Sequence, residues 1–268
     1  MGMSLLDVQD LVVEFPNRHG TLRALDQVSF QIQAGEILGV VGESGAGKSL
    51  TGSAIIGLLQ PPGRIAGGQI KLQGQRIDDL DPEALRRIRG RRIGAIFQDP
   101  LTSLNPLYTI GHQLIETIRT HLPLTVAQAK AKAIELLSDT GIAGAEQRLG
   151  HYPHQFSGGM RQRVVIALAL AADPELIIAD EPTTVILVVK GLDFFLDELL
   201  AAISRIVVEE RMAAIIVEQS ARKILPLTER AIILDRGTIV HEGPSPELAE
   251  DAVRLANLMG IAGTAGAH

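Results

Sequence analysis

The sequence predicts an α/β fold with a parallel sheet at its core. Short runs of continuous apolar residues, at 37–41, 176–179 and 213–217, are typical of strands buried on both faces. A glycine-rich loop and a helical stretch follow the first run, and from residue 100 to about 150 the pattern becomes helical. We therefore expect an α/β core with an N-terminal antiparallel β subdomain and an inserted helical subdomain.

Local patterns predict the remaining elements. Residues 5–15 alternate loosely between apolar and polar side chains, and residues 28–32 do so again after the turn-like segment 17–20. Further strands are expected at 70–72, 93–97, 231–234 and 238–241, and helices at 82–88, 110–122, 126–142, 160–172 and 191–209. We expect one domain over residues 1–268, with a core of 1–99 and 151–243, a helical subdomain at about 100–150, and a C-terminal helix and tail at 244–268. The residues after Met259 are expected to be mobile.

Composition excludes several classes of protein. Hydrophobic residues make up 46% and charged residues 21% of the chain, which argues against wholesale disorder. The longest apolar stretch, 164–172, is far shorter than the roughly 20 residues of a membrane crossing, and the N-terminus lacks the features of a signal peptide. The absence of cysteine excludes disulfides and cysteine-ligated metal or iron–sulfur sites. The net charge of −6 argues against nucleic-acid binding, so we interpret the arginine run at 86–92 as a solvated face.

Residues 42–49 read GESGAGKS and match the phosphate-loop pattern G-x-x-x-x-G-K-[S/T]. The glycines let the backbone curl so that its N–H groups point at phosphate oxygens, and the following helix directs its positive end at the same anion. Lys48 is expected to reach the β- and γ-phosphates, and Ser49 to offer a hydroxyl to Mg²⁺. The alternative is a glycine-rich turn with a chance lysine. The predicted nucleotide contacts are Gly42, Glu43, Ser44, Gly45, Ala46, Gly47, Lys48, Ser49 and Leu50.

A second site is predicted where residues 176–182 read LIIADEP. Acidic side chains that follow a buried strand lie at the carboxyl edge of the sheet, where ligands bind in open parallel sheets. Asp180 is expected to hold Mg²⁺, usually through water, and Glu181 to polarise the attacking water as general base. The alternative is a pair of solvated acids at a strand end, which the phosphate loop in the same chain makes the weaker interpretation.

A third segment, FSGGMRQR at 156–163, precedes a predicted helix. Ser157, Gly158 and Gly159 would present a hydroxyl and backbone N–H groups at the start of that helix, a second anion-binding arrangement. The alternative is a glycine turn before a core helix. Together the three motifs strongly resemble those of the ATP-binding subunits of ATP-binding cassette (ABC) transporters. The signature loop of that family usually reads LSGGQ, and Phe156 and Met160 are the replacements here.

The resemblance implies a nucleotide site shared between two subunits. In this family two cassettes form a head-to-tail dimer around two ATP molecules, and each ATP contacts the signature loop of the opposite chain. The resemblance also implies that Gln98, in FQDP at 97–100, contacts Mg²⁺ and the attacking water. Phe15 lies where the family has an aromatic side chain that stacks on adenine, although an aromatic side chain at a strand end is also common as simple packing. The implied cofactors are ATP and Mg²⁺.

The finer resemblance is to the di- and oligopeptide importer branch, which includes nickel importers. The segments GESGAGKS, FQDPLTSLNPLYTIG and HYPHQFSGGMRQRVVIALAL are very similar to that branch, and the match covers about residues 5–184. Beyond it, Leu187 stands where the family has an aspartate, and Gln219 stands where it has a switch histidine. The C-terminal third, including VEQ at 217–219, is more similar to the branched-chain amino-acid and urea importer branch.

These departures leave three explanations open: an engineered or recombined hybrid, a natural divergent member, and a degenerate ATPase. Gln219 can donate a hydrogen bond but cannot carry a positive charge, so we expect ATP binding to survive and hydrolysis to be slowed. Leu187 places an apolar side chain on a polar dimer seam, so we expect weaker ATP-driven dimerisation.

The sequence therefore predicts an ATP-binding and ATP-hydrolysing subunit of an ABC importer, for peptides or a related solute, that couples dimer closure to transport. The expected partners are a second ATP-binding subunit, identical or different, integral membrane permease subunits, and indirectly a solute-binding protein, but no nucleic acid. We expect a peripheral location at the cytoplasmic face of the cell membrane, with the helical subdomain docked on the permease. The alternatives are an ATP-binding but hydrolysis-impaired cassette and a soluble non-transport ABC ATPase.

Overall fold

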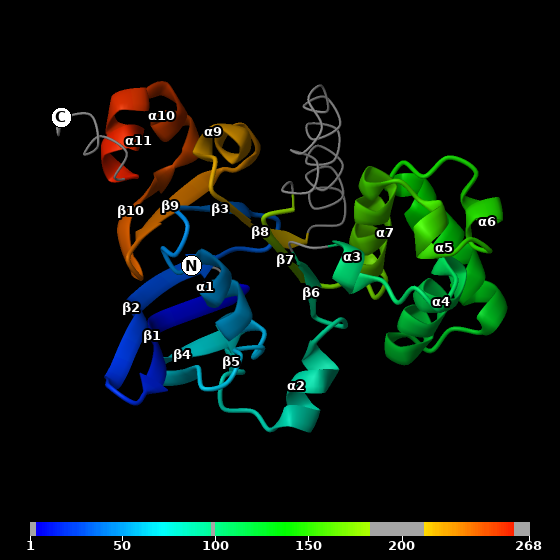
Figure 1. Cartoon of the computed structure of the whole chain (residues 1–268), viewed down its shortest axis with the longest axis horizontal. Helices are drawn as coiled ribbons and strands as arrows, with labels where there is room; N and C mark the ends of the chain where they lie inside the picture. Colours follow the sequence, from blue (N-terminus) through cyan, green and yellow to red (C-terminus); the bar gives the residue numbers. More distant parts are fainter. Residues whose placement is uncertain (1–3, 98–99, 183–211, 260–268) are drawn as a thin grey trace. The chain divides into compact units, whose positions relative to one another are not determined.

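The structure is a computed structural model that describes residues 4–97, 100–182 and 212–259 (Figure 1). The chain divides into two compact units, one formed by Met1–Leu85 with Ala213–His268 and the other by Arg86–Met212. Both units combine strands with helices. Within the described ranges, no helix has both the length and the apolar character that a membrane crossing requires.

The N-terminal part of the first unit is an antiparallel sheet. Its strands lie in the order β2-β1-β4-β5, where β1 is Leu6–Asn17, β2 Gly20–Ile32, β4 Arg64–Leu72 and β5 Gln75–Arg76. In β1 the buried positions change phase between Val8 and Leu11, where a register shift in the pairing with β2 marks a β-bulge. The expected antiparallel β subdomain is confirmed. β2 starts well before residue 28 because its pairing with β1 continues through mostly exposed residues to the turn at Gly20.

The second sheet of the first unit contains the first apolar run. β3 (Ile37–Val41) is buried along its whole length and lies between two parallel neighbours, β8 (Ala213–Glu218) and β9 (Arg230–Asp235). β10 (Thr238–Pro244) pairs with β9 in the antiparallel sense. Continuous apolar character is what a strand covered on both faces requires, and the prediction of a parallel core is confirmed.

Short helices complete the first unit. α1 (Lys48–Ile55) follows β3 and ends earlier than its apolar pattern suggests, because Gly57, with a φ of 65°, turns the chain. The C-terminal part contains α9 (Ala221–Ile224), α10 (Ser245–Glu250) and α11 (Ala252–Leu258). α10 contacts β9 and β10, which confirms helical structure after residue 244.

The second unit combines a parallel strand pair with a group of helices. β6 (Ile93–Ile96) pairs with β7 (Leu176–Asp180), and α2 (Pro82–Ile88) precedes β6. The intervening chain forms α3 (Pro100–Ser103), α4 (Ile110–His121), α5 (Val126–Asp139), α6 (Ala145–Arg148) and α7 (Gly158–Leu170). α3, α4 and α5 each contact α7, as the green part of Figure 1 shows. The helical character of residues 100–150 is confirmed, whereas the helix expected at 191–209 and the last residues of the tail lie outside the described residues.

Candidate nucleotide-binding site

The glycine-rich loop at 42–49 begins at the carboxyl edge of the parallel strands. Val41, the last residue of β3, is in register with Glu218, the last residue of β8, and with Ile233 of β9, which continues for two more residues. Ligands of parallel sheets bind at this edge because the N-termini of the following helices gather there. The first N–H groups of α1, which starts at Lys48, point out of the helix at this end.

Two positions in the loop accept only glycine. A Cβ atom on Gly42 would lie 2.3 Å from the carbonyl oxygen of Leu234 in β9. Gly47 has a φ of 102°, and a Cβ atom there would lie 2.5 Å from Cδ2 of Leu25 in β2. Close approach by two strands and a left-handed backbone therefore give the loop its curled shape.

Lys48 points into the loop. Its side chain is buried, with 4% of the residue exposed, and Nζ donates hydrogen bonds of 2.8 Å to the carbonyl oxygens of both Gly42 and Glu43. The exposed residues of the loop are Glu43, Ser44, Gly45 and Ser49. An ammonium group held inside an open loop, beside a helix N-terminus, is an arrangement that suits a polyphosphate.

Gly237, which no sequence motif identified, supports the loop from outside. Gly237 lies in the turn between β9 and β10, and its N–H donates a hydrogen bond of 3.0 Å to the carbonyl oxygen of Ala46. Its own carbonyl oxygen accepts a hydrogen bond of 2.8 Å from the N–H of Asp26 in β2. The signal was present, because glycine in a short polar segment between two strand-like runs marks a tight turn. The sequence did not indicate, however, that this turn packs against the phosphate loop.

Phe15 lies in β1 with its ring half-buried. It is in register with Leu22 of β2, whose side chain is 61% exposed. The edge of the ring packs so closely on Gly63 that a Cβ atom there would lie 2.7 Å from Cε1 of Phe15. Phe15 thus packs on Gly63, and its stacking on adenine stays a prediction.

Gln219 follows β8 directly and is exposed. Because Glu218 is in register with Val41, Gln219 leaves the sheet at the same edge as the phosphate loop. This position fits a side chain that contacts a bound nucleotide. Its role in hydrolysis stays a prediction, and Leu187, the other departure, lies outside the described residues.

The predicted carboxylates lie in the second unit, at the end of β7. The register of Ala179 with Ile96 puts Asp180 and Glu181 at the carboxyl edge of this strand pair. Asp180 is half-buried, whereas Glu181 is buried and has a φ of 42°, a left-handed conformation that is uncommon outside glycine. Gln98 follows β6 on the same strand pair but lies outside the described residues.

The signature segment forms an exposed helix start in the second unit. Ser157 is the N-cap of α7, and its Oγ accepts a hydrogen bond of 3.3 Å from the N–H of Met160. Ser157 and Gly158 are exposed, and a Cβ atom on Gly159 would meet no atom within 4 Å. Beneath them Phe156 is buried, with the Arg148 guanidinium 5.7 Å from its ring centroid. The segment is therefore open to a ligand from outside the chain.

The interpretation of the arginine run as a solvated face is wrong for Arg92, whereas Arg91 is exposed but also has a partner in the protein. Arg92 makes a bidentate ion pair with Glu175, with both N–O distances at 2.9 Å. Arg91 donates a hydrogen bond of 2.8 Å to the carbonyl oxygen of Ala172. These contacts tie the segment before β6 to the segment before β7, an arrangement that no local pattern reveals.

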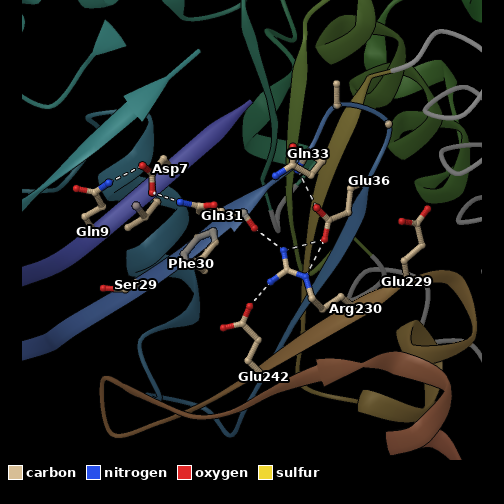
Figure 2. Close-up of a pocket in the computed structure, with 13 residues that line it drawn as sticks. Asp7, Gln9, Ser29, Phe30, Gln31, Gln33, Glu36, Glu229, Arg230 and Glu242 are labelled. Atoms are coloured by element: carbon tan, nitrogen blue, oxygen red, sulfur yellow. Dashed lines mark hydrogen bonds and ion pairs between the residues drawn. The ribbon is translucent and has the colours of Figure 1, made fainter. Parts of the chain in front are cut away.

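A separate polar pocket of about 820 Å³ lies in the first unit (Figure 2). None of the residues that line it belongs to the loop at 42–49. At its centre the Arg230 guanidinium donates to Glu36 at 2.9 Å and also pairs with Glu242, while Asp7 and Glu229 add two further acidic side chains to the lining. Nothing in this pocket points to a particular ligand.

Comparison with known proteins agrees with the geometry. A family model described as ABC transporter matches residues 25–184, more than half of the chain. The dipeptide transport ATP-binding protein DppD of Haemophilus influenzae is 39% identical over 97% of this chain and 83% of the relative. The probable D,D-dipeptide transport ATP-binding protein DdpD of Escherichia coli is 48% identical over a shorter match, 69% of this chain and 56% of the relative.

Solved structures show the same fold. The ATP-binding cassette MJ0796, in a dimeric post-hydrolysis state bound to ADP and Pi, matches with a TM-score of 0.78 and 25% identity over 90% of this chain and 98% of that chain. The chain therefore belongs to the ABC transporter family, and it is an ATPase of that family.

Proposed function

We propose that the chain binds and hydrolyses ATP as a subunit of an importer for peptides or a related solute. The observation that carries the proposal is the phosphate loop, where the Lys48 ammonium lies 2.8 Å from two carbonyl oxygens of the loop at the carboxyl edge of a parallel sheet. The names of DppD and DdpD, both dipeptide transport proteins, support a peptide as the solute.

The residues at the proposed site fit Mg²⁺ together with ATP. Among the described residues, no group of three His, Cys, Asp or Glu side chains could hold a metal ion alone. Mg²⁺ is commonly held by one or two carboxylates together with waters and substrate phosphates. We assign the carboxylate to Asp180, with further oxygens from Ser49 and Gln98. When bound, the ion would neutralise charge on the phosphates. We assign proton acceptance from the attacking water to Glu181, with Gln219 donating a hydrogen bond near the γ-phosphate.

Two features support a dimer as the active form. The chain has one phosphate loop in the first unit and one exposed helix start, Ser157–Gly159, in the second. A head-to-tail dimer uses both, because the signature loop of each chain would complete the ATP site of the other. The MJ0796 cassette is dimeric, which supports this assembly. We further assign adenine stacking to Phe15.

We propose that the helical segment between β6 and α7 docks on membrane permease subunits. Between α3 and α4, Leu107 is 79% and Tyr108 is 47% exposed. Adjacent large apolar side chains in solvent are typical of a contact surface. This assignment places the protein peripherally, at the cytoplasmic face of the cell membrane, where a solute-binding protein would act on it only through the permease.

The steady-state ATPase rate of the purified chain with Mg²⁺ tests the proposal. Lys48→Ala is expected to reduce the rate by at least about 100-fold, because the ammonium stabilises charge on the transferring phosphoryl group. Lys71→Ala, which removes the same charge from β4, is the matched control and is expected to keep the rate. Equal rates in the wild type and Lys48→Ala would contradict the proposal.

A hydrolysis-impaired cassette is the second candidate, favoured by Gln219 at the strand end beside the phosphate loop. Single-turnover hydrolysis separates the candidates, because an impaired cassette would bind ATP and convert it to ADP far more slowly than it exchanges nucleotide.

A further inference from the structure

Gln162 connects the signature helix to the end of β7. It lies in α7, five residues after Ser157, and only 1% of it is exposed. Its Nε2 donates a hydrogen bond of 3.0 Å to the carbonyl oxygen of Pro182. Pro182 directly follows Asp180 and Glu181, so a side chain of α7 contacts the backbone that carries both carboxylates.

The contact with Pro182 fixes the orientation of the Gln162 side-chain amide, and this orientation lowers the stability of the fold. The carbonyl oxygen of Pro182 can only accept a hydrogen bond, so the amide presents Nε2 to it. Oε1 then points into the interior, where it has no hydrogen-bond partner among the described residues. A buried acceptor without a partner destabilises a fold, whereas an apolar side chain of the same shape avoids this penalty. Stability alone therefore favours an apolar residue here, and the contact with Pro182 is what the amide provides.

The backbone held by this contact is strained. Glu181 has a φ of 42° and is only 7% exposed. A left-handed conformation at a residue other than glycine is unfavourable and persists only where surrounding contacts hold it. The hydrogen bond holds the carbonyl group of Pro182, in the second peptide unit after the Cα atom of Glu181, so it restrains the chain directly after the turn.

We propose that Gln162 is a positioning residue that keeps Glu181 oriented and makes this orientation depend on the position of the signature helix. This inference rests on the proposed function, in which Glu181 acts on ATP held by its own chain and Ser157–Gly159 contact the ATP of the second subunit. A movement of α7 during closure on the partner's nucleotide is then transmitted to Glu181 through one hydrogen bond. Contact of the signature loop with ATP at one site thereby orients Glu181, the proton acceptor at the other site.

The first test is independent of ATP. Gln162→Met removes the amide and keeps the shape of the side chain. Amide hydrogen exchange across residues 176–182 is expected to become about tenfold faster, since the strand end loses a constraint. The matched control is Val164→Ala, because Val164 is fully buried in the same helix and its side chain cannot donate to Pro182. Exchange across 176–182 in the control is expected to change only as far as global stability does.

The second test measures catalysis. Gln162→Met is expected to lower kcat about tenfold with KM for ATP unchanged, while Val164→Ala keeps both. Gln162→Glu adds a pH readout, because burial favours the neutral acid, whose O–H can donate to Pro182, and the ionised form cannot. The kcat of this variant relative to the wild type is expected to rise as the pH falls.

The outcomes separate the two proposals. A wild-type protein that hydrolyses no ATP contradicts the proposed function, and hydrogen exchange then still decides whether Gln162 holds the strand end. If Gln162→Met and Val164→Ala show equal exchange at 176–182, or equal kcat in an active enzyme, Gln162 contributes only to packing and the inference is overturned.

Discussion

The phosphate loop of the first unit and the signature loop of the second are both open helix starts, yet different contacts hold them. Neighbouring strands enclose the phosphate loop: Gly42 and Gly47 lie too close to them for a side chain, and Gly237 bonds to Ala46, while the Lys48 side chain bonds to two carbonyl oxygens inside the loop. Side chains hold the signature region, where Ser157 caps α7 and Gln162 bonds to Pro182. A loop enclosed by neighbouring strands cannot change shape without moving them, whereas a side-chain contact such as that of Gln162 can adjust when a second chain arrives.

The largest expected effect concerns the carboxylate of the second unit. Glu181→Gln keeps the shape of the side chain but removes the proton acceptor, so hydrolysis is expected to fall about 1,000-fold while ATP binding persists. Steady-state ATPase and equilibrium nucleotide binding check this. Glu135→Gln, an exposed change in α5, is the control. Loss of ATP binding in Glu181→Gln, or an unchanged rate, would count against the assigned role.

Adding one methyl group to each loop tests the contrast directly. Gly47→Ala is expected to lower the free energy of unfolding by about 2 kcal/mol or more, because the new Cβ combines a left-handed φ with a clash against Leu25. Gly159→Ala is expected to change it by at most about 1 kcal/mol, in the stabilising direction, since its Cβ meets open space in a helix. Urea denaturation measures both, and equal destabilisation would remove the contrast.

Gln219→His tests whether the glutamine at the end of β8 limits ATP hydrolysis. A histidine at this strand end can carry a positive charge near the γ-phosphate, so kcat is expected to rise by up to about tenfold with ATP affinity unchanged. The measurement is the steady-state ATPase rate. A rate that does not respond to the substitution would show that Gln219 does not limit hydrolysis.

The smallest expected effect concerns pH in the second unit. Burial, and then the positive charges of Arg91 and Arg86, lower the pKa of His121 below its ordinary value of 6.5. The folded protein therefore binds this proton less readily than the unfolded chain, so the contribution of His121 to stability is full above pH 6.5 and declines as the pH falls below it. His121→Gln is expected to flatten this decline in urea midpoints measured across that range. His19→Gln, in the exposed β1–β2 turn, is the control, and equal slopes in both variants would contradict the assignment.

Short-range patterns predicted much of the molecule. The run ILGVV before GESGAGKS predicted both a strand buried on two faces and the loop that follows it, because these properties depend on neighbouring residues. Contacts between distant segments could not be predicted in this way. Gln162 reaches Pro182 and Arg92 reaches Glu175 only because the fold brings separate parts of the chain together. The roles of Gln98 and Leu187 stay predictions from resemblance.

In the proposed dimer, the phosphate loop of one chain and the signature loop of another form one ATP site. Mixing a Lys48→Ala chain with a Ser157→Arg chain tests it, because each variant alone is expected to be inactive. In a mixed dimer, the intact phosphate loop of the Ser157→Arg chain would face the intact signature loop of the Lys48→Ala chain. Random mixing is predicted to restore activity up to a ceiling of about one quarter of the wild-type ATPase rate, since half of the dimers are mixed and each has one complete site. A mixture as inactive as its components would contradict the account.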